Sequence, residues 1–344
     1  MRKVLASCAM IGVLCSVATG FKKADNPGPQ VASYANAFLD KLTDDQKSLA
    51  VMDYDNAKRV DWHFIPKKSR KGLVLREMNK AQRTAALRLV KSALSEAGYG
   101  KASKIMMLEG VLRELEGPNR NWERDPNKYY VTIFGTPGDK GKWGLSFEGH
   151  HLSTNFSFRD GQLVDSTPQF MAANPATVMN KVSGPLGKGT RVLRDEEQLG
   201  FDLVNSLSGD ALTAAVIAEE APAEIRFAGA VQAKVGDPEG VAFSAMDKKS
   251  QELLQQLVAA YVDVVTENVA QERRDMIAED GWASVHFAWA GAKKPGVGHY
   301  YKVRGKRFLI EFVNTQADAA GNPANHIHCV WRDLTGDFDL PPAK

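Results

Sequence analysis

Apolar residues recur at helical spacing through the first third of the chain. The clearest case is residues 77–97, where apolar side chains three or four positions apart would line one face of a helix. These positions are Met78, Ala81, Ala85, Val90 and Leu94. Gly98 is expected to end this helix. Further helices are predicted over residues 32–41, 44–53, 101–116, 195–207 and 250–271.

In the middle of the chain and again near its end, apolar and polar residues alternate strictly, which is typical of strands. We find no internal repeat and no low-complexity tract. We therefore predict a single α+β domain over residues 32–344, with a helical N-terminal segment packed on a mostly antiparallel sheet built from middle and C-terminal strands. The predicted strands cover residues 129–134, 143–158, 283–290, 298–303, 308–314 and 326–332.

The last predicted strand has one apolar and one polar face. Alternate residues of a strand point to opposite sides of the sheet. The set that begins with Ile327 is apolar and should face the core, whereas the opposite set contains His326, His328 and Arg332. Two neighbouring imidazoles repel when protonated, and a shared cation removes that repulsion. The alternative is a pair of hydrogen-bonded histidines that line a polar groove.

A second histidine cluster follows residues 143–147, whose alternation should turn Trp143 and Phe147 toward the core. On the opposite face Glu148 and His150 form a carboxylate–imidazole pair. Beyond Gly149 the apolar parity changes, which predicts a bulge there. With that bulge, His151 rather than His150 would be the residue that binds the metal.

Two further residues in predicted strands carry candidate chemistry. His299 opens one strand and is a candidate additional ligand. Glu311 lies inside an apolar run, where a carboxylate needs a partner. It is either a ligand, an acceptor for a ligand imidazole, or the partner of an arginine such as Arg304 or Arg307.

The N-terminus predicts export to the periplasm or the medium. Residues 1–20 have two basic residues, an apolar run and then small residues, as a signal peptide does, and residues 21–31 read as a linker. The run is too short for a membrane span. Processing would leave Cys329 as the only cysteine, which we expect to be a buried thiol. The formal net charge of +3 gives no sign of a nucleic-acid partner.

Blocks of sequence along most of the chain resemble a family of exported bacterial proteins, with fungal members, known only as a domain of unknown function. The family supplies no activity to carry over. It usually has Asp-Asn-Thr-Gln where this chain has Val313-Asn-Thr-Gln, which argues against a role for an acid at position 313. The main blocks are Trp62-His-Phe-Ile-Pro, Phe134-Gly-Thr-Pro, Phe147-Glu-Gly-His-His-Leu-Ser, Thr167-Pro-Gln-Phe, Leu309-Ile-Glu-Phe-Val-Asn-Thr-Gln and Asn325-His-Ile-His-Cys-Val-Trp-Arg-Asp.

These patterns predict an exported metal-dependent enzyme whose substrate the sequence does not disclose. The expected metal residues are His326 and His328, one of His150 and His151, and His299 or Glu148 to complete the site. A divalent ion is expected, zinc first, with iron or copper as alternatives.

Hydrolysis is the leading reaction. Glu148 or Asp333 would act as general base, and Arg332 would stabilise an anionic intermediate. The alternatives are a metal-dependent oxygenase and a non-catalytic protein that binds a carbohydrate or a peptide.

Overall fold

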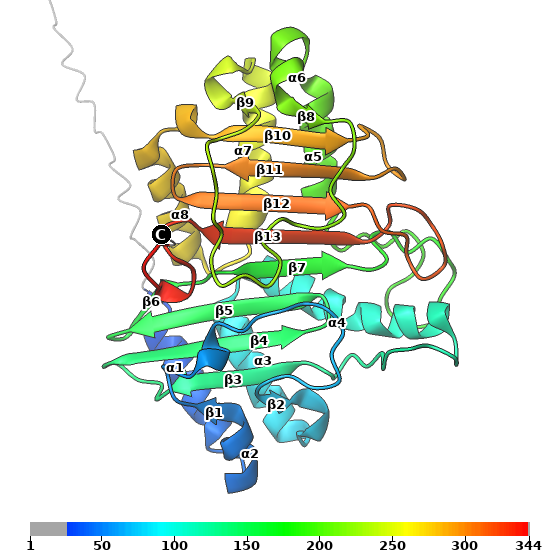
Figure 1. The fold of residues 1–344 in the computed structure, drawn as a ribbon. Helices are drawn as coiled ribbons and strands as arrows, with labels where there is room; N and C mark the ends of the chain where they lie inside the picture. Colours follow the sequence, from blue (N-terminus) through cyan, green and yellow to red (C-terminus); the bar gives the residue numbers. More distant parts are fainter. Residues whose placement is uncertain (1–25, 343–344) are drawn as a thin grey trace, which may run out of the picture.

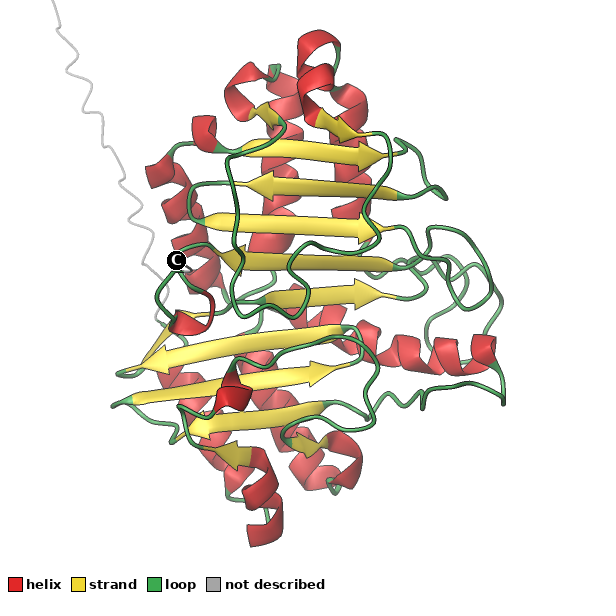
Figure 2. Cartoon of the chain, in the orientation of Figure 1, coloured by secondary structure: helices red, strands yellow, loops and turns green. Residues whose placement is uncertain are grey.

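The computed structural model describes residues 26–342, so the expected signal peptide lies outside the described part. Within it, one 13-stranded sheet carries eight α-helices on one face (Figure 1). Loops cross the other face (Figure 2). The predicted α+β class is confirmed. The helices are α1 (Gly28–Leu39), α2 (Asp44–Ala50), α3 (Lys80–Ala93), α4 (Glu96–Glu116), α5 (Arg194–Ser206), α6 (Gly209–Ala215), α7 (Lys248–Val262) and α8 (Glu267–Asp280).

The strands run in the order β1-β3-β4-β5-β7-β13-β12-β11-β10-β8, with β2, β6 and β9 paired beside this path. Neighbours on the path are antiparallel, except that β1 is parallel to β3 and β8 is parallel to β10. The strands are β1 (Val51–Met52), β2 (Leu73–Val74), β3 (Tyr130–Gly135), β4 (Lys142–Gly149), β5 (Leu152–Arg159), β6 (Gln162–Asp165), β7 (Gln169–Ala173), β8 (Val216–Ala218), β9 (Val241–Ala242), β10 (His286–Gly291), β11 (His299–Arg304), β12 (Phe308–Asn314) and β13 (Ile327–Asp333).

This order contains an internal repeat that the sequence does not reveal. Each half has a long helix, a short helix and a parallel edge strand, then a two-residue strand, a helix pair and a three-stranded meander. The last strands of the two halves, β7 and β13, pair antiparallel at the middle of the sheet, with Met171 opposite Cys329. Matching the strand registers of the two meanders places an approximate twofold axis between Gln169 of β7 and Trp331 of β13.

Equivalent backbone contacts support the repeat. Gly72 and Gly240 have φ values of +93° and +92°, and both precede a two-residue strand and a 3₁₀ turn. A side chain on either glycine would collide with the backbone of β3 or β10. The side chains of Arg83 and Gln251, one turn into α3 and α7, both donate to the carbonyls that flank the preceding 3₁₀ turn.

Two predicted helices are interrupted where the halves meet. Instead of continuing to residue 97, α3 ends at Ala93, and Ser95 caps α4 by accepting a hydrogen bond from the amide of Gly98. Gly98 therefore begins a helix rather than ending one. A Cβ there would lie 2.0 Å from the carbonyl oxygen of Val264, in the link that divides the predicted helix 250–271. The glycine is needed for close approach.

Smaller differences occur at other boundaries. Helix α1 begins at Gly28, inside the predicted linker. Residues 51–52 form an edge strand rather than the end of a helix. The predicted strand over residues 143–158 is a hairpin, in which Gly149 pairs with Leu152 and the two histidines between them form the turn. Turn geometry, not a bulge, changes the apolar parity.

The sheet buries apolar side chains on both faces. Ile327, Cys329 and Trp331 belong to the large core under the helices, as the alternation predicts. Val330 lies on the opposite face in a smaller cluster with Trp62, Phe64 and other residues of the covering loops. His328 and Arg332 share the face of Val330 and are buried beneath these loops.

Candidate metal centre

Three imidazoles converge where the ends of β4, β7, β12 and β13 meet. The Nε2 atom of His326 lies 2.9 Å from that of His151 and 3.0 Å from that of His328. One ring nitrogen from each residue lies within 4.8 Å of the others. Tetrahedral zinc with Zn–N bonds of about 2.1 Å separates its ligand atoms by about 3.4 Å. The three histidines are therefore close enough to hold one metal ion.

His151 reaches this point through an unusual backbone conformation. It occupies the second position of the β4–β5 turn with φ of +64°, a left-handed value that is uncommon for residues other than glycine. Its amide donates to the carbonyl of Phe64, and its carbonyl accepts from the amide of Ala172 on β7, both at 2.9 Å. These two bonds fix the turn over the sheet.

The other two histidines are positioned by strand pairing. His328 lies in β13 between Val313 of β12 and Ala172 of β7. His326 precedes the strand, and its amide donates to the side-chain oxygen of Asn314 at 2.9 Å. Asn314, at the end of β12, therefore fixes the entry of the chain into β13.

The environment keeps two of the clustered rings, those of His151 and His326, neutral. His151 and His328 are each 4% exposed. Burial, and then the neighbouring imidazoles, lower the pKa of His151 well below its usual value and that of His326 to about 2. A neutral imidazole offers the lone pair that a metal needs. At neutral pH the rings of His151 and His326 therefore present lone pairs rather than positive charges.

Two side chains that the sequence analysis did not select contact the rings from outside. Both carboxylate oxygens of Glu224 lie near Nδ1 of His328, at 2.8 and 2.7 Å. The amide group of Asn174 lies 3.3 Å from Nδ1 of His326. A carboxylate at Nδ1 keeps the proton on that atom and directs the Nε2 lone pair inward, as at many metal sites.

His150 lies beside the group rather than within it. Its Nδ1 atom contacts a carboxylate oxygen of Glu109 on α4 and lies 3.1 Å from a guanidinium nitrogen of Arg124. Burial lowers the pKa of His150, and the negative charge of Glu109 partly offsets this shift. The ring stacks on that of His151 with centroids 3.7 Å apart. Of the two adjacent histidines, His151 joins the group and His150 supports its ring.

The structure places the remaining sequence candidates elsewhere. Glu148 is buried in an ion pair with Lys71, at 2.9 Å. His299 lies on the helix-covered face, where it stacks with Trp289 and its Nε2 atom lies 3.3 Å from a carboxylate oxygen of Glu197. Neither belongs to the histidine group.

Arg332 and Asp333 lie at the other end of β13, on the order of 13 Å or more along the strand from His328. Arg332 is fully buried and donates to Asp337 at 2.7 Å and to loop carbonyls. Asp333 accepts from the amide of Thr335 in the following turn. Both residues stabilise the end of the strand, far from the imidazoles.

Glu311 lies outside the histidine group, and its carboxylate hydrogen-bonds neither a ligand imidazole nor an arginine side chain. One of its oxygens accepts from the hydroxyl of Tyr300, at 2.7 Å, and from the backbone amide of Arg226, at 3.1 Å. The other oxygen is buried without a hydrogen-bond partner. Burial raises the pKa of this carboxyl group.

Comparisons with known proteins give a family but no activity. A family model described as "Protein of unknown function (DUF3500)" matches residues 24–340, so the chain belongs to this family. No curated protein and no solved structure matches the chain. Within residues 26–342, no helix combines the length and apolar character needed to cross a bilayer.

Proposed function

We propose that this chain, a member of a family without an assigned activity, is a metal-dependent hydrolase that binds zinc through His151, His326 and His328. The observation that carries the proposal is the convergence of three imidazole Nε2 atoms, one from a turn and two from the start of a strand. Three protein ligands are the usual number in catalytic zinc sites, which keep a further position open.

The residues around the histidines suit this role. Glu224 holds His328 in the tautomer whose Nε2 lone pair faces the centre. When Nδ1 of His326 carries the ring proton, the side-chain oxygen of Asn174 is able to accept a hydrogen bond from it. This requires only a flip of the Asn174 amide group, which exchanges its oxygen and nitrogen. A zinc ion on three imidazoles lowers the pKa of a bound water to about 7 and polarises a substrate carbonyl or phosphoryl group.

Metal content is the first test. We expect the purified protein to contain close to one zinc per chain and His326→Ala to contain almost none, as measured by elemental analysis. His286→Ala is the matched control, since His286 lies on β10, away from the centre, and its ring hydrogen-bonds the carbonyl of Ser284. Wild-type protein that fails to retain or take up zinc on titration contradicts the proposal.

The affinity for zinc tests the role of Glu224. Loss of a carboxylate behind a ligand imidazole typically weakens metal binding by 10- to 100-fold. We expect that loss for Glu224→Gln in competition with a chromophoric chelator. Glu220→Gln, a change at an exposed residue of the same loop, should leave the affinity unchanged.

Hydrolysis is tested separately, on ester, amide and phosphoester substrates with zinc-loaded and chelated protein. Three imidazoles without a carboxylate ligand also suit iron and copper, so a metal-dependent oxidoreductase is the second candidate. Stoichiometric iron or copper with oxygen consumption would favour it. A protein that contains no metal but retains a sugar or peptide would be a binding protein.

Export remains part of the proposal. A mature N-terminus near residue 21, found by mass spectrometry of protein from the periplasm or medium, supports it. An intact N-terminus on cell-retained protein contradicts it.

A further inference from the structure

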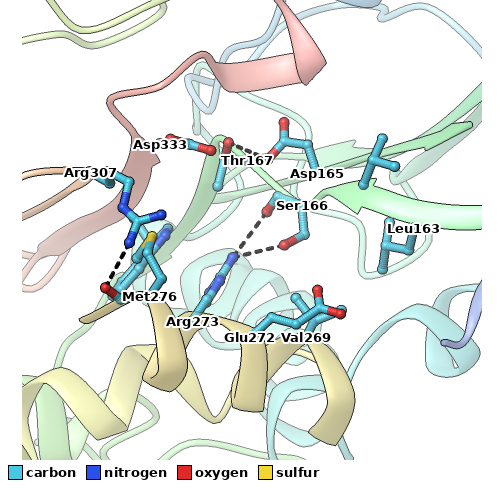
Figure 3. A pocket seen from close by; sticks show the side chains of 12 residues that line it. Leu163, Asp165, Ser166, Thr167, Val269, Glu272, Arg273, Met276, Arg307 and Asp333 are labelled. Atoms are coloured by element: carbon cyan, nitrogen blue, oxygen red, sulfur yellow. Dashed lines mark hydrogen bonds between the residues drawn. The ribbon is translucent and has the colours of Figure 1, made fainter. Parts of the chain in front are cut away.

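A pocket of about 160 Å³ lies at the opposite end of the β7–β13 pair from the histidines, on the helix-covered face. Its walls come from α8, from the segment that joins β6 to β7, and from the end of β13 (Figure 3). The apolar part of the lining includes Leu163, Val269, Met276 and Trp331. Arg273 points from α8 across this space toward Ser166 (Figure 3).

Arg273 is a buried cation whose hydrogen bonds all go to neutral groups. It is 7% exposed. It donates to the side-chain oxygen of Gln169 at 3.2 Å and to the hydroxyl and carbonyl of Ser166 at 2.9 and 3.4 Å. Its guanidinium also lies over the ring of Trp331, 4.7 Å from the centroid. Burial lowers its pKa to about 10, which leaves it charged at neutral pH.

The carboxylates of Asp165 and Asp333 lie near enough to raise the pKa of Arg273, but each accepts its hydrogen bonds from other groups. Arg307 is paired with Glu279 and Asp280 of α8. Asp165 accepts from the hydroxyl of Thr167 at 2.8 Å, and burial raises its pKa well above the usual value. Asp333 accepts from Thr335. Among the described residues that line the pocket, no carboxylate forms an ion pair with Arg273.

We infer that this pocket binds a small monocarboxylate, whose charged group pairs with Arg273 and whose apolar body lies against Val269, Met276 and Trp331. A guanidinium has five N–H donors, and the three hydrogen bonds of Arg273, one from Nη1 and two from Nη2, leave one donor on Nε and one on Nη1. These two lie on different edges of the guanidinium, so a ligand carboxylate would accept a charge-assisted hydrogen bond from one of them. A buried arginine without an anionic partner is costly, and a ligand carboxylate would remove that cost.

Size and charge narrow the class of ligand. A cavity of about 150 Å³ in another protein accommodates benzene, so this pocket suits a molecule with a body of that size. Asp165, Glu272 and Asp333 at its walls disfavour a dianion such as phosphate. Benzoate is therefore a suitable probe, and benzyl alcohol is its uncharged counterpart.

Calorimetric titration of the full chain with benzoate tests the inference. We expect saturable binding to the wild type and binding at least tenfold weaker for benzyl alcohol. Arg273→Gln should weaken benzoate binding by at least tenfold, whereas Arg274→Gln, on the neighbouring, partly exposed arginine of α8, should not. Val269→Trp, which fills the pocket and keeps the arginine, should also abolish binding and covers the case that Arg273→Gln does not fold.

The titration is repeated on chelated protein and on His326→Ala, because a carboxylate is also able to bind a metal ion. Binding that survives both treatments assigns benzoate to the Arg273 pocket whether or not zinc is present at the histidines. Three outcomes overturn the inference: no saturable binding to the wild type, equal affinity in Val269→Trp, or loss of binding on chelation.

Discussion

One backbone torsion decides which histidine faces the candidate centre. His150 and His151 occupy a two-residue turn, and the positive φ of His151 turns its ring toward His326, while His150 contacts Glu109. Left-handed backbone costs a residue with a side chain on the order of 1 kcal/mol relative to glycine. The protein thus accepts local strain at the residue that brings the third imidazole.

This strain gives a prediction at the residue scale. In metal-free protein, His151→Gly should be about 1 kcal/mol more stable to urea unfolding than His151→Ala, since glycine adopts positive φ freely. Both variants should lose zinc binding. Equal stabilities of the two variants would mean that the turn relaxes to another conformation when the imidazole is absent.

Glu311 gives a second prediction, in the pH dependence of stability. Burial raises its pKa in the folded protein above the unfolded value of about 4.5. Its contribution to stability is therefore complete below that pH and is lost as the pH rises through the folded pKa. The slope reaches at most about 1.4 kcal/mol per pH unit.

Glu311→Gln removes this ionisation and keeps an oxygen for Tyr300 and the amide of Arg226. In metal-free protein, the stability of the variant relative to the wild type should rise between pH 4 and pH 8, as measured by urea unfolding at each pH. A constant difference would show that Glu311 ionises as readily in the folded chain as in the unfolded one.

Residue-level patterns in the sequence predict the strand faces of β13 but not the surroundings of its histidines. The alternation of Ile327, His328 and Cys329 follows from strand geometry alone. Glu224 and Asn174 come from loops without periodicity, and only long-range folding brings them to the rings. Choosing between His150 and His151 likewise required a torsion angle that the adjacent residue types do not specify.

At the element scale, the two glycines that begin the repeated strand–turn–helix unit should be equally intolerant of substitution. A Cβ would lie 2.5 Å from the carbonyl oxygen of Val131 at Gly72 and 2.1 Å from that of Phe287 at Gly240. We expect Gly72→Ala and Gly240→Ala each to cost about 2–4 kcal/mol in the free energy of unfolding.

Gly281 at the end of α8 is the matched control. Its φ of +78° is also left-handed, but a Cβ there meets no other atom within 4 Å. Gly281→Ala should therefore cost only about 1 kcal/mol. Similar losses at all three glycines would show that the backbone conformation, not the contact with the neighbouring strand, sets the cost.

The repeat escaped sequence analysis because its two copies share mainly what the backbone requires. Gly72 and Gly240 are retained at the close approach, and Asn79 and Asp247 both cap the following helix. The side chains that donate to the preceding turn differ, with Arg83 in one copy and Gln251 in the other. Contacts of the same geometry made by different residue types leave little similarity between the two sequences.

At the scale of the whole molecule, the two halves share one sheet and one core, and they should unfold together. Cys329 reports on this, because it lies at the junction between the halves, 3% exposed, and its thiol donates to the carbonyl of Met171 at 3.2 Å. Burial also raises its pKa, which lowers its reactivity.

We therefore expect a thiol reagent to label Cys329 no faster than the chain unfolds globally. The measurement is the mass of the peptide that contains Cys329, followed over time beside the loss of circular dichroism. Labelling well ahead of unfolding would show that β7 and β13 separate while each half stays folded.

The twofold relation between the halves also bears on the number of metal ions that each chain is expected to bind. The residues that the axis relates to His326 and His328 are Val164 and Ser166, since the axis passes between Gln169 and Trp331. Neither is a histidine, a cysteine or a carboxylate, the side chains that bind zinc. Among the described residues, His151, His326 and His328 form the one group whose ligand atoms are close enough for a metal ion, so the twofold arrangement of the backbone is not matched by the side chains, and we expect one zinc per chain rather than two.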